Sequence, residues 1–233
     1  MTTELNDPIL DRLSKLETGQ ISDVLDEAGL PNHALSSALF ALIPGKRFVG
    51  RAACLKGEPF VQGKAQKPAV AADTMEQVVK AGTVLVIEAG DFQGGALLGG
   101  FVAYSLQRQG CQAIVTDGAI RDADEIRDLG LQCVQRTITP VNGARRWRQT
   151  QAGEAVHMPG QTGSRVEIRD GDYLVGDGDG VVVIPARVVE QIVEDSEELL
   201  RLERKIGVEL RAGGTRQDVF KANPRFAHVR SAL

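Results

Sequence analysis

The chain has 233 residues, 42% hydrophobic and 25% charged, a composition typical of a globular protein and not of a disordered chain. Its net charge of −4 excludes a global positive field, so nucleic acid is not an expected partner. No apolar run reaches membrane-spanning length and no leader pattern begins the chain, so we expect a cytoplasmic protein with no membrane partner. Cys54, Cys111 and Cys133 lie among apolar neighbours, which predicts free buried thiols.

The N-terminal half predicts helices that alternate with buried strands. Apolar residues at helical spacing, with capping residues and closing glycines, indicate the helices, and short apolar runs indicate the strands. The predicted helices lie at 13–29, 73–81 and 96–109, and the predicted strands at 43–55, 83–87 and 113–116. The later elements form a strand, a glycine-rich loop, a helix and a second strand, which predicts a parallel crossover unit.

The C-terminal half predicts short strands followed by a long helix. The strands are expected at 133–139, 165–168, 173–175 and 181–184, and the basic run 145–148 is interpreted as a solvated loop or a subunit contact. The segment 176–180 lacks the spacing and the terminal Glu of a calcium loop, so we interpret it as a tight turn. An apolar stripe predicts a helix at 186–211, expected at a subunit interface. No linker divides residues 1–233, so we expect a single α/β domain.

Arg121 and Asp122 stand between the strand at 113–116 and the start of a predicted helix. Such a junction aims side chains and free backbone N–H groups at a ligand. The N–H groups from Gly99 to Val102 can approach a carboxylate closely, and Arg121 can add a two-pronged hydrogen bond. Asp122 is a hard oxygen ligand of the kind that Mg²⁺ takes. The dipeptide alone is more often a helix cap with a surface ion pair.

The wider spacing resembles a known family. Gly100, twenty intervening residues, Arg121-Asp122, two residues and Glu125 form the pattern G-x20-R-D-x2-E, which is similar to that of the RraA-like family. The resemblance extends through the segments 21–25 and 170–185. The family contains class II 4-hydroxy-4-methyl-2-oxoglutarate/4-carboxy-4-hydroxy-2-oxoadipate aldolases and the regulator of ribonuclease E activity. It implies an αββα sandwich with a long C-terminal helix, assembled as a homotrimer or homohexamer with active sites between subunits.

The resemblance also implies roles for individual residues. In the aldolases the residue matching Asp122 ligates a divalent metal, which we expect to be Mg²⁺, with Mn²⁺ as the alternative. Arg121 matches the arginine that binds the pyruvoyl carboxylate and carbonyl. The backbone of Gly99, Gly100, Phe101 and Val102 matches the segment that receives the carboxylate. A glutamate from the neighbouring subunit's C-terminal helix approaches the metal's waters, and Glu198 and Glu203 are both candidates for it.

Gly100 departs from the aldolase pattern. That position is commonly Asp or Glu in the aldolases, where the side chain helps to orient the water involved in proton transfer. Asp117, Asp124 or a metal-bound water takes over this role, or the protein runs a simpler reaction such as decarboxylation of a keto acid, or it has lost the chemistry.

The sequence therefore predicts a divalent-metal-dependent lyase that cleaves a C–C bond in short, carboxylate-rich α-keto acids through a pyruvate enolate. The expected reactions are retro-aldol cleavage of 4-hydroxy-4-methyl-2-oxoglutarate-type substrates and oxaloacetate decarboxylation. The alternatives are a non-enzymatic regulatory or binding protein of the same family, and a family lyase with a different substrate.

Overall fold

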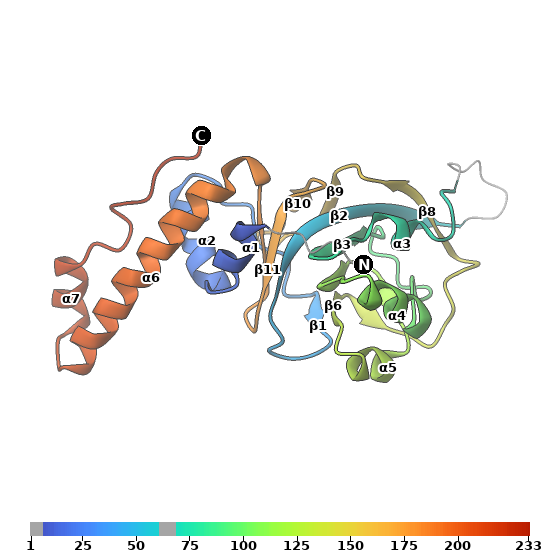
Figure 1. The fold of residues 1–233 in the computed structure, drawn as a ribbon, viewed down its shortest axis with the longest axis horizontal. Coiled ribbons are helices and arrows are strands. Elements are labelled where there is room, and N and C mark those ends of the chain that lie inside the picture. The colour runs from blue at the N-terminus through green and yellow to red at the C-terminus, as the bar shows by residue number, and fades with distance from the viewer. Residues whose placement is uncertain (1–6, 61–68) are drawn as a thin grey trace.

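The computed structural model of the protein describes residues 7–60 and 69–233 (Figure 1). Within these residues, one curled sheet of eight strands forms the body of the fold. The central strands β2, β3, β4 and β6 run parallel, and the outer strands run antiparallel to their neighbours. The spatial order is β1 (Phe40–Ala41), β6 (Gln132–Gln135), β4 (Ala113–Thr116), β3 (Thr83–Glu88), β2 (Phe48–Pro59), β11 (Tyr173–Gly176) and β12 (Val181–Ile184), with β8 (Trp147–Ala152) beside the second half of β2.

Three helices connect the parallel strands and cover one face of that part of the sheet. Leu106 and Ile126, from two of these helices, pack on Leu85 of β3 in one buried cluster. Strands β3 and β4 pair in parallel, with Val84 opposite Ala113, which confirms the predicted crossover unit. The helices are α3 (Thr74–Val78), α4 (Gly100–Arg108) and α5 (Ala123–Asp128).

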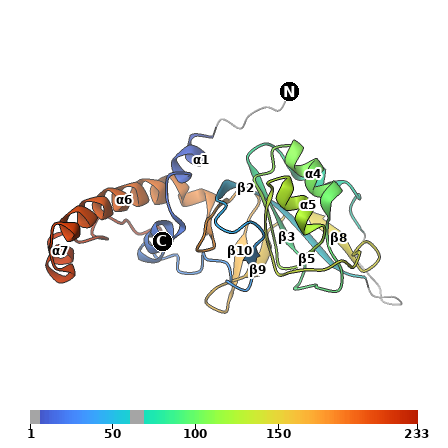
Figure 2. The ribbon, with the colours of Figure 1, turned by 90° about the horizontal axis from the view of Figure 1, so that it is seen from below.

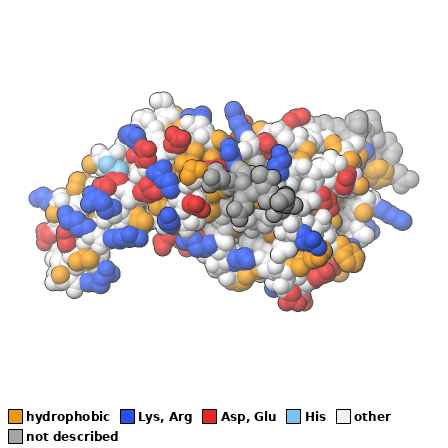
Figure 3. Space-filling model, viewed as in Figure 1, with side chains coloured by type: hydrophobic (Ala, Val, Ile, Leu, Met, Phe, Trp, Pro, Cys, Tyr) orange, Lys and Arg blue, Asp and Glu red, His pale blue; other side chains and the backbone are white. Residues whose placement is uncertain are grey.

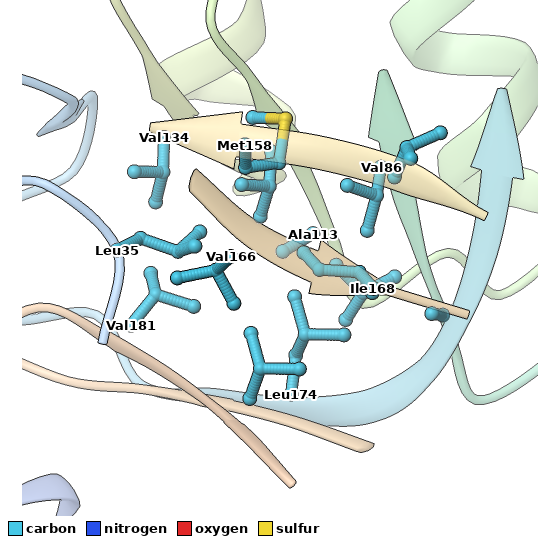
Figure 4. Packing of buried hydrophobic residues seen from close by; sticks show 14 of the residues in the cluster. Leu35, Val86, Ala113, Val134, Met158, Val166, Ile168, Leu174 and Val181 are labelled. Carbon is cyan, nitrogen blue, oxygen red and sulfur yellow. The ribbon is translucent and has the colours of Figure 1, made fainter. Parts of the chain in front are cut away.

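A two-stranded ribbon packs inside the curl of the sheet. It consists of β9 (Val156–Pro159) and β10 (Arg165–Ile168), paired antiparallel. Met158 and Val166 of the ribbon share a buried apolar core with Val86, Ala113 and Leu174 of the sheet (Figure 4). This core holds two β layers together. A smaller ribbon, β5 (Ala119–Ile120) with β7 (Thr137–Ile138), lies beyond the ends of β4 and β6.

A second group of helices covers β11 and β12. Leu13, Leu25 and Ile192 from these helices pack on Val175 and Ile184 of the two strands. The layers are therefore helix, sheet, sheet and helix, which confirms the αββα sandwich with a long C-terminal helix. The helices are α1 (Pro8–Leu13), α2 (Thr18–Glu27) and α6 (Val189–Arg211), the last preceded by a short 3₁₀ turn (Ala186–Val188).

The C-terminal helices form one end of the molecule. Helix α6 runs on beyond the sheet to α7 (Arg216–Ala222), as the two ribbon views show (Figure 2). Figure 3 shows acidic and basic side chains intermixed over this end. In the described part of the chain, no helix is both long and apolar enough to cross a membrane.

The three cysteines are free and buried, as predicted. Burial raises the pKa of the Cys111 thiol to about 11, so this sulfur stays protonated near neutral pH. Burial likewise raises the pKa of Cys54 and of Cys133 above the usual range for a thiol. The thiols therefore serve as small apolar side chains of the core.

Three helix predictions extend too far. The helix predicted over 13–29 begins only at Thr18, where Glu17 and Gln20 form a capping box, and it ends at Glu27; Leu13 instead ends the separate helix α1. The helix predicted over 73–81 ends at Val78. The helix predicted over 96–109 begins only at Gly100. The residues before it bond to neighbouring loops instead, as where the Leu97 N–H donates to the Ala119 carbonyl at 2.8 Å.

The strand predictions are wrong where the alternation of apolar and polar residues is weak. Strand β8 is not predicted, because Trp147 is its one buried side chain. The basic run 145–148 ends within this strand instead of forming only a loop. The predicted strand 133–139 divides into β6 and β7, which pair with different partners. Strands at 165–168 and 181–184 have the predicted bounds.

Asp177 confirms the tight turn predicted at 176–180. Its carboxylate accepts hydrogen bonds from the Thr18 N–H at 2.9 Å, the Thr18 hydroxyl at 2.7 Å and the Asp179 N–H at 3.0 Å. The side chain therefore ties the β11–β12 turn to the start of α2. Burial alone would raise the pKa of Asp177, but these hydrogen bonds outweigh it and hold the pKa below its usual value.

Asp177→Ala is expected to lower the free energy of unfolding by about 1–2 kcal/mol at neutral pH, because buried donors at Thr18 lose their acceptor. A carboxyl group with a lowered folded pKa stabilises the fold above its unfolded pKa of about 4 and loses that effect as the pH falls through the folded value. The difference should therefore shrink in acid. Urea unfolding at neutral and acidic pH measures it, with the exposed Asp179→Ala as control. Equal stability of wild type and Asp177→Ala at neutral pH would contradict this role.

Candidate active site

Two loops meet at the carboxyl ends of β3 and β4. The first runs from β3 to α4 and the second from β4 to α5. Backbone hydrogen bonds join them, since the Leu97 N–H donates to the Ala119 carbonyl at 2.8 Å and the Arg121 N–H donates to the Leu98 carbonyl at 3.2 Å. These bonds place Gly99 and Gly100 beside Arg121 and Asp122, as the spacing in the sequence predicts.

Asp122 reaches from the start of one helix to the start of another. It precedes α5 and adopts a left-handed backbone conformation with φ of 56°. Its carbonyl accepts the Ile126 N–H at 3.0 Å, while its Oδ2 accepts the Gly100 N–H at the start of α4 at 2.9 Å. A left-handed non-glycine residue costs of order 1 kcal/mol or more. This strain aims the carboxylate across the site instead of at its own helix.

Arg121 and Gly99 are packed tightly around that carboxylate. Arg121 Nε lies 3.6 Å from Asp122 Oδ2, and this is the one ion pair of Arg121 among the residues that the structure describes. A Cβ added at Gly99 would lie 2.3 Å from Asp122 Oδ2 and 2.9 Å from Arg121 Nε, so any larger residue would displace both of these side chains. The Arg121 side chain is 37% exposed, which leaves its guanidinium able to bind a ligand.

Glu125 fills the space beside Gly100. A Cβ added at Gly100 would lie 2.0 Å from Glu125 Oε2 and 2.2 Å from its carboxyl carbon. The exposed carboxylate of Glu125 on α5 therefore occupies the volume that an acidic side chain at position 100 would enter from α4. The sequence pattern includes Glu125 but did not predict its contact with position 100. The available signal is that a glycine begins this pattern and a glutamate ends it.

Asp117 and Asp124, the two carboxylates expected to replace an acidic side chain at position 100, make other contacts. Asp124 is 97% exposed and pairs with Arg127 on the same helix. Asp117 is completely buried, where it accepts the Ala89 N–H at 2.6 Å and the Asp91 N–H at 3.0 Å. Burial raises the pKa of Asp117, although the two N–H groups oppose the shift. Asp117 therefore holds the loop after β3 in shape.

The backbone segment expected to receive a carboxylate is partly occupied. The Gly100 N–H already donates to Asp122. The next N–H groups, at Phe101 and Val102, belong to the first turn of α4 and have no carbonyl of that helix to bond. The Phe101 side chain itself is 90% exposed.

A cavity of about 460 Å³ adjoins these groups. Gly99 and Arg121 form one side of it, so it opens directly onto the residues that contact Asp122. The remaining walls come from the segments 69–72, 96–98 and 142–144, from α3, from the start of α4 and from strand β8. Such a volume is typical of small-molecule sites.

Asp122 fits a divalent cation of the Mg²⁺ type. Mg²⁺ keeps several waters and usually takes one or two protein carboxylates. The Asp122 side chain is 42% exposed and accepts a hydrogen bond at Oδ2, which leaves Oδ1 for a ligand. No group of three or more His, Cys, Asp or Glu side chains able to hold a metal occurs within residues 7–60 and 69–233. The donor set therefore suits a cation bound mainly through water and substrate oxygens.

Glu198 and Glu203 differ in their surroundings on α6. Glu203 accepts hydrogen bonds from Gln20 Nε2 at 2.8 Å and from Arg225, so it is engaged within its own chain. Glu198 pairs with Arg201 one turn away on the helix surface, and this pair holds the pKa of Glu198 below its usual value. Of the two, Glu198 is the more available to another subunit.

Comparison with known proteins finds a family whose model matches most of the chain. The RraA-like family model, described as Aldolase/RraA, matches residues 18–183. A Paraburkholderia phytofirmans protein named "Putative 4-hydroxy-4-methyl-2-oxoglutarate aldolase" is 33% identical over 151 residues, which cover 64% of this chain and 86% of the relative. A Halalkalibacterium halodurans protein of the same name is 32% identical over 185 residues, 77% of each chain.

Solved structures show the same fold. A Streptomyces coelicolor protein, described as an unusual member of the RNase ES inhibitor RraA protein family, superposes with a TM-score of 0.75 at 24% identity. The superposition covers 88% of this chain and 98% of the other. At that identity the likeness concerns the fold, and the chemistry has to be argued from the residues of this chain.

Proposed function

The chain belongs to the RraA-like family, and from this premise we propose that it is a lyase that cleaves a C–C bond in an α-keto acid. The names of its relatives support a lyase. The observation that carries the proposal is the grouping of Arg121, Asp122 and Glu125 around Gly99 and Gly100, where a fixed cation, a hard ligand and an exposed carboxylate share one site.

Arg121 would bind and orient the keto acid. Its guanidinium and the free N–H groups at Phe101 and Val102 would hold the substrate carboxylate and the neighbouring carbonyl. Asp122 would hold the divalent cation, which when bound polarises the keto oxygen as a Lewis acid. As the C–C bond breaks, negative charge develops on that oxygen, and the nearby charge of Arg121 would stabilise it.

Glu125 would move the proton in the aldol reaction. In a 4-hydroxy-2-oxo acid, its carboxylate would accept the proton of the C4 hydroxyl. The O–H electron pair then forms the new C4 carbonyl, and the C3–C4 pair becomes the enolate of pyruvate. The proton held by Glu125 is then available for C3, which yields pyruvate and regenerates the carboxylate. Decarboxylation of oxaloacetate needs the same enolate stabilisation but has no hydroxyl to deprotonate.

The proposal is tested by pyruvate release from 4-hydroxy-4-methyl-2-oxoglutarate and from oxaloacetate, each with Mg²⁺, with Mn²⁺ and with EDTA. We expect turnover of at least one compound that requires the cation and stops with EDTA. Folded protein without metal-dependent turnover on either compound would remove the proposal in this form. The non-enzymatic regulator of the same family, or a lyase for another substrate, would then be the better description.

Arg121→Lys is expected to lower kcat/KM by about tenfold to a hundredfold on both compounds, because lysine keeps the charge but loses the planar fork that grips a carboxylate. Steady-state kinetics measure the effect. Arg127→Lys is the matched control, since Arg127 pairs with Asp124 on the outside of α5. An Arg121→Lys enzyme as active as that control would assign the carboxylate contact to another group.

We also propose that the chain acts as a homotrimer or homohexamer, in which Glu198 of one subunit lies near the site of its neighbour. The highly exposed Phe101, next to Gly100 at the start of α4, supports a covered site because such a side chain gains from burial. Sedimentation equilibrium is expected to give three or six copies per particle. A monomer that retains full turnover would contradict this assembly.

A further inference from the structure

The cavity beside Gly99 and Arg121 extends well past the space that pyruvate needs. We propose that it is a subsite for the half of the substrate that leaves, and that it selects an uncharged, largely apolar group. This inference rests on the proposed lyase function. It departs from the carboxylate-rich substrates that the family resemblance implies.

The size of the cavity points to a larger leaving half. Its volume is about 460 Å³. At roughly 30 Å³ for each water-sized group, the six heavy atoms of pyruvate fill less than half of it. Because Gly99 and Arg121 line the cavity and also contact Asp122, a keto acid bound at Arg121 would extend its distal half into the remaining space.

The walls of that space are mostly apolar. Val70, Met75, Leu97, Val102 and Trp147 line it. Met75 and Trp147 are buried in the core that also packs α4 against the sheet, so they form a firm floor.

The Trp147 ring is held in place by the strand beneath it. A Cβ added at Gly57 of β2 would lie 2.1 Å from the Trp147 ring, so the indole rests directly on that glycine. An apolar ligand group that covers this rigid aromatic and thioether surface removes it from water, and this burial of apolar surface favours binding.

The charges around the cavity disfavour a second carboxylate. Arg121 is assigned to the keto acid itself. Arg148, the other cation among the described lining residues, donates to Glu58 at 3.0 Å, so its charge is already offset. Glu76 adds a negative charge to the wall. A distal carboxylate would thus lose water without gaining an unpaired cation among these residues.

Binding of two keto acids that cannot undergo retro-aldol cleavage tests the preference directly. Calorimetry with Mg²⁺ would compare 4-phenyl-2-oxobutanoate with 2-oxoglutarate. We expect the phenyl compound to bind about tenfold more tightly or better, within the range by which pockets discriminate. Equal binding, tighter binding of 2-oxoglutarate, or binding of neither compound would overturn the subsite.

An added cation provides the matched variant. Ala72 is exposed and lines the cavity, so Ala72→Arg places a positive charge there without disturbing the core. The preference for the phenyl compound should fall by about tenfold, because the distal carboxylate then has a partner. Ala38→Arg adds the same charge at an exposed alanine outside the cavity and should leave the preference unchanged. Equal preferences in the two variants would contradict the proposal.

A separate readout distinguishes this subsite from the lyase function. Exchange of the pyruvate methyl protons in D₂O requires enolate formation but no leaving half. Exchange without a binding preference would leave the lyase and remove the subsite. A preference without exchange would leave the subsite and remove the lyase. With both present, pyruvate release should be faster from 4-hydroxy-4-phenyl-2-oxobutanoate than from 4-hydroxy-4-methyl-2-oxoglutarate, and the reverse order would overturn the subsite.

Discussion

Glu125→Gln is expected to slow retro-aldol cleavage by about 10²- to 10⁴-fold, the usual contribution of a positioned general base. The amide keeps the size of the side chain but cannot accept the hydroxyl proton. Oxaloacetate decarboxylation should change only a few-fold, because that reaction removes no such proton. The ratio of the two kcat values, measured on one preparation, therefore reports the role of Glu125.

The packing at Gly100 supplies a stricter form of the same test. Gly100→Asp should rescue the Glu125→Gln enzyme less than the Glu125→Ala enzyme, since in the former the new side chain has to displace the one at position 125. In Glu125→Ala that space is open, and adding Gly100→Asp should restore part of the cleavage from the other helix.

Asp128→Asn, which removes an exposed carboxylate from the same helix as Glu125, serves as control. A Glu125→Gln enzyme that loses both reactions equally would show that Glu125 supports the site without moving the proton. One that loses neither would exclude it from the chemistry.

Asp122→Ala is expected to lower turnover of both compounds by about 10²- to 10³-fold, because the cation that Asp122 would hold no longer helps Arg121 to stabilise the developing oxyanion. The change also leaves the Gly100 N–H without its acceptor, so the first turn of α4 should be less stable. Both reactions should fall together, in contrast to Glu125→Gln. Kinetics over a range of Mg²⁺ concentrations measure the effect, and calorimetric Mg²⁺ titration shows whether binding is lost.

The control for this change is Asp124→Ala, two residues further along. Asp124 is 97% exposed and pairs only with Arg127 among the described residues, so turnover should stay within a few-fold of wild type. If Asp122→Ala retained metal-dependent turnover at the level of this control, the metal-ligand assignment would move elsewhere.

The elements that sequence reasoning located best are those with a strong, local apolar pattern. Strands β3, β4 and β12 are continuous apolar runs buried on both faces, and α6 carries an apolar stripe over many turns. Strand β8 was not predicted because Trp147 is its one buried side chain, so its sequence pattern resembles that of a polar loop. A local sequence pattern indicates only which residues of one element are buried. Strand β8 forms because it pairs with β2, and such pairing is not visible in the local pattern.

At the candidate site, the sequence by itself determined the chemical types and their spacing. It placed Arg121 and Asp122 after a buried strand, and it showed that position 100 lacks a side chain. Those facts follow from residue identity and local pattern. Together with the segments 21–25 and 170–185 they carried the family resemblance, which in turn implied the layered fold.

Only the tertiary structure decided which carboxylate stands beside Gly100. Asp117, Asp124 and Glu125 all lie within a few residues of Arg121 in the chain, yet one is buried under a loop, one points to solvent and one rests on Gly100. Their directions depend on how two loops from different strands are joined by hydrogen bonds and on the turn at Asp122. The spacing of residues within one segment cannot predict how close α4 comes to it, because α4 begins more than twenty residues earlier and packing between the two segments sets that distance.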